Sequence, residues 1–316
     1  MTITIVGSGA FGTALALCYA ACGDVILWSR NAETLAKTRH SPRLPGHSLP
    51  DNVVVTDNLA CLHEATVLLA LPTQQLGAFL EGMPAPIAPK AMVACCKGID
   101  LASGLGPVDL IARHQPSCIP AVLTGPSFAV DIAKGLPTAL IVAAPNAADA
   151  DHLQDMLAAP NLRVYSSDDV MGAQLGGALK NVIAIACGAV MGAGLGVSAR
   201  AALLARGLAE MRRFSEHFGA QADTLSGLAG LGDLVLTATS EQSRNYRFGV
   251  SLAVGRAFDA STTVEGAATA RAVVDLARSH AIDVPICETV ASLVAEELTV
   301  QQAMERLLAR PLKREA

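Results

Sequence analysis

One lysine stands in a strongly apolar segment of this sequence. Lys180 lies within 172–191, where every other residue except Gln174 and Asn181 is small or apolar. Such a segment predicts a helix that is buried on all sides. A buried ammonium group loses its hydration, and a carboxylate or a substrate phosphate has to offset that cost. Lys180 is therefore a candidate for a catalytic acid–base group.

Two other interpretations of this segment involve no catalysis. The charge-free run 182–197 carries Gly188, Gly192 and Gly196 at the spacing of membrane helix contacts. The run is rich in Ala and Gly and has no aromatic belt, so we expect no membrane span and attribute the glycines to close helix packing. Alternatively, the lysine extends from the helix start into solvent. The remaining motifs favour the catalytic interpretation.

An acid and an arginine later in the chain are suited to act with this lysine. Asp233 follows a glycine turn at 228–232 and is surrounded by apolar residues. It either caps the following helix or orients the Lys180 ammonium group and stabilises its charge. Arg244, between a serine and an asparagine before another helix, either forms a phosphate clamp or belongs to a plain helix cap.

A glycine loop at the beginning of the chain predicts a dinucleotide site. Gly7, Gly9 and Gly12 form a G-x-G-x-x-G motif between a β-branched strand at 2–6 and a helix at 13–21. In this setting the first glycine permits the tight turn, the second lets the backbone approach a pyrophosphate, and the third lets the helix pack on the strand.

The position after the second strand bears on the choice between NADH and NADPH. In NAD-binding folds an acid there holds the adenosine ribose, but this chain has Ser29 and Arg30 after the strand at 24–28. Arg30 can pair with a 2′-phosphate, which slightly favours NADPH over NADH. The alternative is a surface arginine that begins a helix.

Three further loops follow predicted strands and therefore lie over the same crevice. Pro72 and Thr73 end the strand at 66–71 and are placed to line the nicotinamide pocket. Lys97 follows the strand at 91–95. At this position we expect it to contact a phosphate or carbonyl group; the alternative is a solvated lysine in a loop.

The third loop, 125–129, follows a strand at 119–124 and leads into a helix for which Ser127 is the predicted N-cap. Its free amide groups are placed to meet the substrate or the nicotinamide.

Strands dominate up to about residue 166 and helical patterns follow after Val170. The 316 residues, 52% of them hydrophobic, suffice for two cores. We therefore predict an α/β fold with a Rossmann-like doubly wound N-terminal domain at 1–170 and an all-α C-terminal domain at 171–316, which holds the substrate and catalytic groups.

Charge and cysteine usage exclude several classes of function. The net charge is −5 and no basic run occurs, so we expect no nucleic-acid partner. The eight cysteines include no Cys-x-x-Cys motif and have apolar neighbours, which predicts reduced thiols and no metal site. Met1 leads directly into a strand without a targeting pattern, and we expect a cytoplasmic protein.

Seven motifs together resemble the bacterial NAD(P)-dependent glycerol-3-phosphate dehydrogenases in order and spacing, over essentially the whole chain. They lie at 7–12, 96–98, 125–129, 176–181, 230–234, 243–245 and 264–266. The resemblance implies reversible reduction of dihydroxyacetone phosphate to sn-glycerol 3-phosphate with NADP or NAD as cofactor. It also implies a role in glycerophospholipid synthesis and a homodimer.

The resemblance assigns roles to individual residues. Lys180 becomes the proton donor and acceptor, with Lys97 and Asp233 as further catalytic groups. The substrate contacts it implies are Lys97, Gly125, Ser127, Lys180, Asp233, Ser243, Arg244 and Asn245. The cofactor contacts, together with the glycine loop, are Gly7, Gly9, Ala10, Phe11, Gly12, Arg30, Lys97, Ala129, Arg244, Thr263 and Glu265.

The chain departs from the family pattern near the cofactor. Ala10 and Phe11 stand where Ser-Trp is frequent, Thr263 replaces a frequent valine, and Ser29 lies where histidine or arginine is common. These departures concern cofactor preference and leave the chemistry intact.

In the mechanism we expect, hydride passes from the nicotinamide to the carbonyl carbon, and Lys180 neutralises the alkoxide that forms. Arg244 binds the phosphate group of the substrate. Two alternatives remain: a related two-domain dehydrogenase for a 3-hydroxy or keto acid, and a dinucleotide-binding sensor without turnover.

Overall fold

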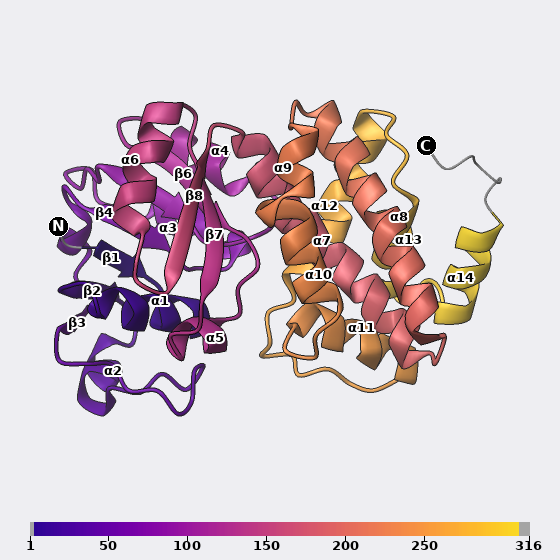
Figure 1. Ribbon diagram of the computed structural model, residues 1–316, viewed down its shortest axis with the longest axis horizontal. Helices are drawn as coiled ribbons and strands as arrows, with labels where there is room; N and C mark the ends of the chain where they lie inside the picture. Colours follow the sequence, from indigo (N-terminus) through magenta and orange to yellow (C-terminus); the bar gives the residue numbers. More distant parts are fainter. Residues whose placement is uncertain (1–2, 310–316) are drawn as a thin grey trace.

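The computed structural model describes residues 3–309 and has two lobes (Figure 1). Residues 3–167 contain all the strands that the structure describes and form the sheet lobe. Residues 170–309 are helical and form the helical lobe, which ends at the far side from the N-terminal strand. This architecture confirms the predicted fold class, an α/β Rossmann-like part followed by an all-α part. The division into domains at 170/171 stays a prediction.

Eight strands form one sheet in the order β3-β2-β1-β4-β5-β6-β7-β8. Their bounds are β1 (Ile3–Val6), β2 (Val25–Trp28), β3 (Val53–Thr56), β4 (Thr66–Leu69), β5 (Ala91–Ala94), β6 (Ile119–Thr124), β7 (Thr138–Ala143) and β8 (Leu162–Ser167). The first six are parallel; β7 runs antiparallel to β6, and β8 runs parallel to β7. The chain leaves β1 in one direction for β2 and later returns to its other side for β4, so the loop after β1 lies at the switch point where such sheets bind ligands.

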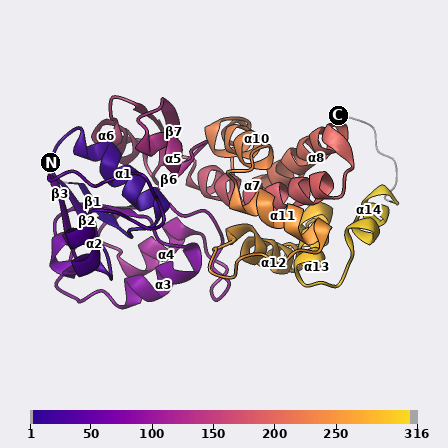
Figure 2. The ribbon, with the colours of Figure 1, turned by 90° about the horizontal axis from the view of Figure 1, so that it is seen from below.

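Helices cover both faces of this sheet, because its strands are apolar on both sides. The helices of this lobe are α1 (Ala10–Ala20), α2 (Ala32–Thr38), the 3₁₀ turn η1 (Leu59–Leu62), α3 (Thr73–Glu81), α4 (Pro107–His114), α5 (Ala129–Ala133) and α6 (Ala147–Leu157). Figure 2 shows α1 and α6 on one side of the strands and α3 and α4 on the other. The buried side chains agree: Leu15 and Leu153 pack with Ile5, whereas Leu76 and Leu110 pack with Val6.

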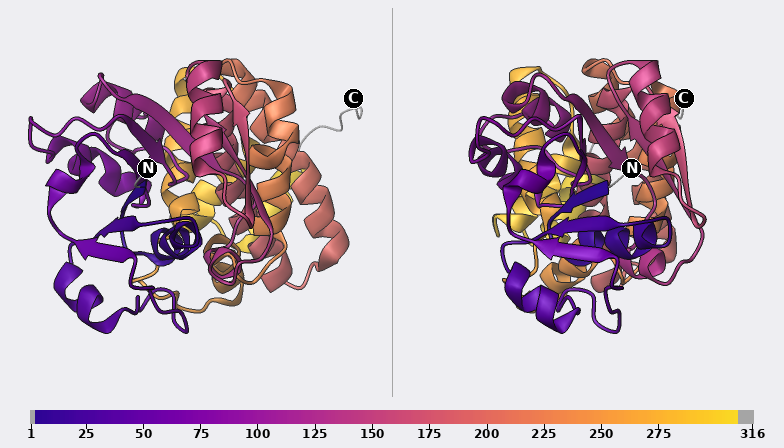
Figure 3. Two further views of the ribbon diagram at one scale, coloured as in Figure 1. Left: turned by 60° about the vertical axis from the view of Figure 1, so that its left-hand side comes forward. Right: turned by 90° about the vertical axis from the view of Figure 1, so that its left-hand side faces the viewer.

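The helical lobe is built around one long central helix, α7 (Val170–Gly192). The others are α8 (Gly196–His217), α9 (Ala222–Ser226), the π-helical turn η2 (Leu228–Gly232), α10 (Asp233–Ala238), α11 (Arg244–Val254), α12 (Glu265–Ser279), α13 (Pro285–Val294) and α14 (Val300–Leu308). Helix α7 packs against α8, α10, α11 and α12, and its first part also contacts β6 and β7. It therefore lies at the junction between the lobes. Figure 3 shows the two lobes from two further directions.

Helix α7 is long and apolar enough to cross a membrane, but 83% of its most apolar window is buried inside the protein. Its Asp169 N-cap accepts a hydrogen bond from the amide of Gly172, and the buried stretch runs from there to Ala189. Helix α7 thus forms the core of the helical lobe.

Glycines bring α7 and α11 into backbone contact. A Cβ atom on Gly188 would lie 2.0 Å from the carbonyl oxygen of Tyr246, and one on Gly249 would lie 2.0 Å from that of Ile185. Gly192 faces α11 in the same way, whereas Gly196 has nothing within 4 Å. The packing explanation of the glycine spacing is therefore confirmed for the first two predicted positions and wrong for Gly196.

The 125–129 loop differs from its prediction. Helix α5 begins at Ala129 with Phe128 as its N-cap, and the Ser127 hydroxyl group donates to the carbonyl oxygen of Gly125 instead. The N-cap prediction for Ser127 was wrong because the helix begins at Ala129, which leaves Ser127 one position before the cap.

Gly249→Ala tests the close contact between α7 and α11. We expect it to lower the free energy of unfolding by about 1–3 kcal/mol or more, because the new methyl group overlaps the Ile185 carbonyl group and the helices must separate. Urea unfolding followed by circular dichroism measures the change. Gly77→Ala, within α3, is the matched control: its Cβ meets nothing within 4 Å, so alanine should leave stability unchanged or raise it slightly. Equal midpoints for both variants would contradict the contact.

Candidate active site

The predicted lysine lies deep inside the junction between the two lobes. Lys180 is in the third turn of α7, and only 6% of its surface is exposed. Its ammonium group lies 3.0 Å from Oδ1 of Asp233 and donates to the Thr237 hydroxyl group at 2.7 Å. The expected carboxylate partner is therefore present, and the lysine points inward.

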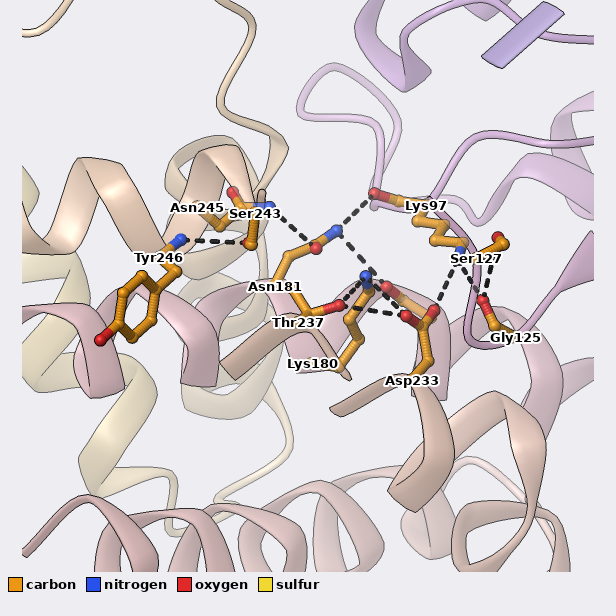
Figure 4. A network of polar contacts seen from close by, with 11 residues as sticks. Lys97, Gly125, Ser127, Lys180, Asn181, Asp233, Thr237, Ser243, Asn245 and Tyr246 are labelled. Carbon is orange, nitrogen blue, oxygen red and sulfur yellow. Dashed lines mark hydrogen bonds and ion pairs between the residues drawn. The ribbon is translucent and has the colours of Figure 1, made fainter. Parts of the chain in front are cut away.

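A second lysine reaches the same carboxylate from the sheet lobe. Lys97 follows β5, and its Nζ lies 2.5 Å from Oδ2 of Asp233 and donates to the carbonyl oxygen of Gly125 at 2.9 Å. Figure 4 shows Lys97 approaching from the strand side and Lys180 from the helical side. One buried carboxylate thus pairs with two ammonium groups that come from different lobes.

Burial and charge set the protonation of this cluster. Burial lowers the pKa of Lys180 to about 8, although the charge of Asp233 opposes the shift. Burial by itself would raise the pKa of Asp233, but the charges of Lys180 and Lys97 outweigh it and hold that pKa below its usual value. The result is a carboxylate that stays ionised beside a lysine able to exchange a proton near neutral pH.

Thr237 belongs to this cluster although the sequence analysis did not single it out. It lies one helical turn after Asp233 on α10; its hydroxyl group accepts from Lys180 and donates to Oδ1 of Asp233 at 3.1 Å. The spacing of four residues places both side chains on one face of the helix, a signal that the sequence does contain.

Asn245 and Asn181 join three helices beside the lysine cluster. Asn181 accepts from the amide nitrogen of Asn245 at 2.8 Å, and the side-chain oxygen of Asn245 accepts from the backbone amide of Gly266 at 3.0 Å. Asn245 was predicted to contact the substrate, and here its side chain connects α7, α11 and the start of α12. Asn181, next to Lys180, was not among the predicted site residues.

The predicted phosphate clamp lies at the start of α11. The Ser243 hydroxyl group caps this helix by accepting from the amide of Tyr246 at 3.2 Å, and Arg244 is exposed as the first helical residue. The charge of Arg244 reaches Glu265 of α12: burial raises the pKa of Glu265, and Arg244 opposes this more than any other neighbouring charge. Arg244 is therefore exposed to solvent and close enough to the start of α12 to act on Glu265.

The glycine loop has the geometry that a bound pyrophosphate requires. A Cβ on Gly7 would lie 2.6 Å from the Ala70 carbonyl oxygen, and one on Gly12 would lie 1.9 Å from the Gly7 carbonyl oxygen, so both positions admit only glycine. A Cβ on Gly9 would meet nothing within 4 Å, which leaves space beside the backbone. Ala10 and Phe11 form the first turn of α1, whose amide groups point toward this space.

The end of β2 carries hydroxyl groups and an arginine. Ser29 is buried, and its hydroxyl group lies 2.7 Å from that of Ser8 in the glycine loop. Arg30 is exposed beside it. This edge of the predicted ribose site therefore contains a cation and neutral hydroxyl groups.

A cavity of about 220 Å³ lies between the lobes, at the carboxyl ends of β4 and β5. Thr73, Gly98, Thr263, Glu265 and Thr269 contribute to its lining, and Glu265 accepts from the backbone amide of Thr73 at 3.3 Å. The predicted cofactor residues Thr263 and Glu265 are thus brought to the loop after β4. Ala129, the remaining predicted contact, begins α5, which packs against α1.

A larger cavity of about 960 Å³ lies elsewhere, between the end of α7, the end of α11 and α14. None of the predicted site residues lines it. Among the described residues, the predicted catalytic residues Lys97, Lys180 and Asp233 therefore lie at the lobe junction and not at this larger cavity.

Asp233→Asn tests the shared carboxylate. It keeps the shape and leaves two buried ammonium groups without their anion, so we expect the free energy of unfolding at pH 7 to fall by about 3–5 kcal/mol. Urea unfolding measures it. Adding Lys180→Met, which removes one of the two charges, should restore part of the loss. Glu33→Gln, which breaks an exposed pair with Lys37, is the control and should change little. An equal loss in the single and double variants would contradict the pairing.

Comparisons with known proteins match both lobes of the chain to one family of dehydrogenases. The sequence model for the N-terminal part of NAD-dependent glycerol-3-phosphate dehydrogenase matches residues 2–150, and the model for the C-terminal part matches residues 169–305. A protein of Roseobacter denitrificans named glycerol-3-phosphate dehydrogenase (NAD(P)+) is 57% identical over 320 residues and covers 100% of both chains.

Solved structures extend the comparison. The glycerol-3-phosphate dehydrogenase of Coxiella burnetii superposes with a TM-score of 0.91 at 36% identity and covers 98% of this chain and 99% of its own. A ketopantoate reductase of Ralstonia eutropha, at 16% identity and a TM-score of 0.61, covers 96% of this chain and 100% of its own, and shares the fold alone.

Proposed function

The chain belongs to the NAD-dependent glycerol-3-phosphate dehydrogenase family, and on this premise we propose that it interconverts dihydroxyacetone phosphate and sn-glycerol 3-phosphate with NAD(P)H. The observation that carries the proposal is the Asp233 carboxylate shared by Lys97 and Lys180 at the lobe junction. It places two cations where a carbonyl oxygen acquires negative charge, next to the crevice in which this fold binds a dinucleotide.

The donor count of the two ammonium groups supports this role. An ammonium group has three N–H donors. The contacts of Lys180 occupy two of them, with Asp233 and Thr237; those of Lys97 also occupy two, with Asp233 and Gly125. Each lysine therefore keeps one donor for the substrate, and its direction is fixed by the other two.

In the direction of reduction, NAD(P)H held at the glycine loop would supply the hydride that the carbonyl carbon receives. Lys180 donates its proton to the carbonyl oxygen, and Asp233 stabilises its ammonium form before the transfer. Lys97 stabilises the developing negative charge from the sheet lobe. In the reverse direction neutral Lys180 takes the proton from the alcohol.

The start of α11 supports a phosphorylated substrate. Arg244 is exposed there, and the first amide groups of an 11-residue helix add to its attraction for an anion. We assign the substrate phosphate to Arg244 with the amide groups around Ser243 and Asn245. The Asn245 side chain is occupied by Asn181 and Gly266 and acts by holding this helix start in place.

The cofactor and the cellular setting are further parts of the proposal. The open space beside Gly9 and the first turn of α1 suit the pyrophosphate, and Arg30 beside Ser29 slightly favours NADPH over NADH. We also propose a cytoplasmic homodimer that supplies glycerophospholipid synthesis. The eight free cysteines suit a reducing compartment.

Oxidation of NADPH or NADH, followed at 340 nm with each candidate ketone, separates this proposal from its alternatives. Turnover with dihydroxyacetone phosphate and not with ketopantoate or a 3-keto acid supports it. Turnover with a carboxylate substrate instead would identify a related dehydrogenase, and cofactor binding without any turnover would identify a sensor.

The pKa of Lys180 predicts opposite pH dependences for the two directions. Reduction needs the ammonium form, so its rate should fall as pH rises through about 8, whereas oxidation needs the neutral amine and should rise through about 8. Lys180→Ala should lower kcat about 10²–10⁴-fold, whereas the Kd for NADPH should stay unchanged. Lys37→Ala, at an exposed lysine, should change neither rate nor pH profile. Retained turnover in Lys180→Ala would refute the assignment.

Arg244→Ala tests the phosphate clamp. Loss of a charge-assisted contact should raise the KM for dihydroxyacetone phosphate about 10- to 100-fold, with a smaller change in kcat. Steady-state kinetics measure both constants. Arg247→Ala is the matched control on the same helix, because Arg247 is bound to the carbonyl oxygens of Glu241 and Gln242 and should leave the KM unchanged. An unchanged KM in Arg244→Ala would rule out the clamp.

A further inference from the structure

Two imidazole rings face each other where helices α8 and α12 end. His217 is the last residue of α8, and His280, 63 positions later in the chain, is the C-cap of α12. Nε2 of His217 lies 3.3 Å from Nδ1 of His280, and both residues are exposed. Imidazole is the commonest metal ligand in proteins, so the pair is a candidate metal site outside the proposed active site.

A phenylalanine holds the two rings in this arrangement. The Phe218 ring packs edge-on against both imidazoles, with ring centroids 5.2 Å from His217 and 5.1 Å from His280. Phe218 in turn packs against the fully buried ring of Phe214, at 5.0 Å. The imidazole rings are therefore supported by the core of the helical lobe, and they lose less rotational freedom when they bind a common ion.

A second contact fixes the two helix ends relative to each other. Arg213, one turn before His217 on α8, donates to the carbonyl oxygen of Asp283 from Nε at 3.0 Å and from Nη2 at 2.7 Å. Asp283 lies three residues after His280. The separation of the two imidazole nitrogens is thus also set by the packing of α8 against the turn after α12.

This separation fits a tetrahedral zinc ion. Two nitrogen ligands at the usual Zn–N distance of about 2.0–2.1 Å stand about 3.3–3.4 Å apart at a tetrahedral angle. The two nitrogens here are 3.3 Å apart. The ion takes the place of the ring hydrogen between them, and the ring that gives up this hydrogen carries its proton on its other nitrogen, so both imidazoles stay neutral. Because both rings are exposed, they can tilt until both lone pairs point at the ion.

The helix ends add favourable charge. The last carbonyl groups of a helix carry a partial negative charge, and α8, with 22 residues, and α12, with 15 residues, both end at this pair. Among the described residues no third histidine, cysteine or carboxylate completes a metal-binding group, so water fills the remaining positions. The site is therefore open to solvent, unlike a closed structural zinc site.

We propose that His217 and His280 bind a divalent transition-metal ion, with Zn²⁺ as the best fit, and that the ion fastens the end of α8 to the end of α12. No metal site was expected from the cysteine spacing; here the ligands come from two separate helices, which no local pattern brings together. The site lies at the end of α12 opposite to Glu265, so it is separate from the proposed active site and its test does not depend on dehydrogenase activity.

Isothermal titration calorimetry with ZnCl₂ tests the assignment. Cys22→Ser serves as the reference protein, because Cys22 is exposed and a thiol also binds zinc. His217→Phe and His280→Phe, made in this reference, keep a ring against Phe218 and remove the nitrogen ligand. Each should lower the Zn²⁺ affinity by about 10- to 100-fold or more, since the loss of an outer-shell partner alone costs that much.

His152→Phe is the matched control, because His152 is exposed on α6 in the sheet lobe, and it should leave the Zn²⁺ affinity unchanged. Saturating Zn²⁺ should raise the Tm of the reference and of this control, but not of the two other variants, because an ion that binds only the folded chain stabilises it. His217→Ala and His280→Ala form a second pair, for use where phenylalanine impairs folding, and should show the same losses.

A reference protein that binds no Zn²⁺ overturns the assignment. An affinity and a Tm shift that stay unchanged in His217→Phe or in His280→Phe overturn it as well, and so does an equal loss of affinity in His152→Phe.

Discussion

The junction between the lobes depends on one buried carboxylate that neutralises two ammonium groups. Without Asp233, Lys97 and Lys180 would repel each other in a place with little water to screen them. With it, the sheet lobe and the helical lobe share an ion cluster, and each lysine is held by two contacts. The cluster therefore connects the lobes and fixes the position of both ammonium groups.

The rest of the helical lobe keeps this cluster dry and in place. Helix α7 carries Lys180 and is surrounded by other helices, which is why burial dominates the pKa of that lysine. Backbone contacts at Gly188 and Gly249 fix α11 against α7, so the start of α11, with Arg244, lies at a set position relative to Lys180. Close packing of α7 and α11 thus determines where the start of α11 lies in the helical lobe.

Both lobes also contribute to the crevice at the carboxyl edge of the sheet. The glycine loop and the carboxyl ends of β1, β4 and β5 form one edge of the sheet, and α12 from the helical lobe covers part of it with Glu265 and Thr269. Groups from both lobes therefore surround the cavity next to the lysines.

Local sequence patterns determined the fold class, the glycine loop between β1 and α1, and the burial of Lys180. Each depends on residues close together in the chain: G-x-G-x-x-G between a strand and a helix, or a charge within an apolar helix. Only the tertiary structure decided which groups meet. It brought Lys97 to Asp233 across 136 positions, placed Thr237 between Lys180 and Asp233, and occupied the Asn245 side chain within the protein. Those contacts join separate strands and helices, and their partners follow from packing, which no local pattern in the sequence encodes.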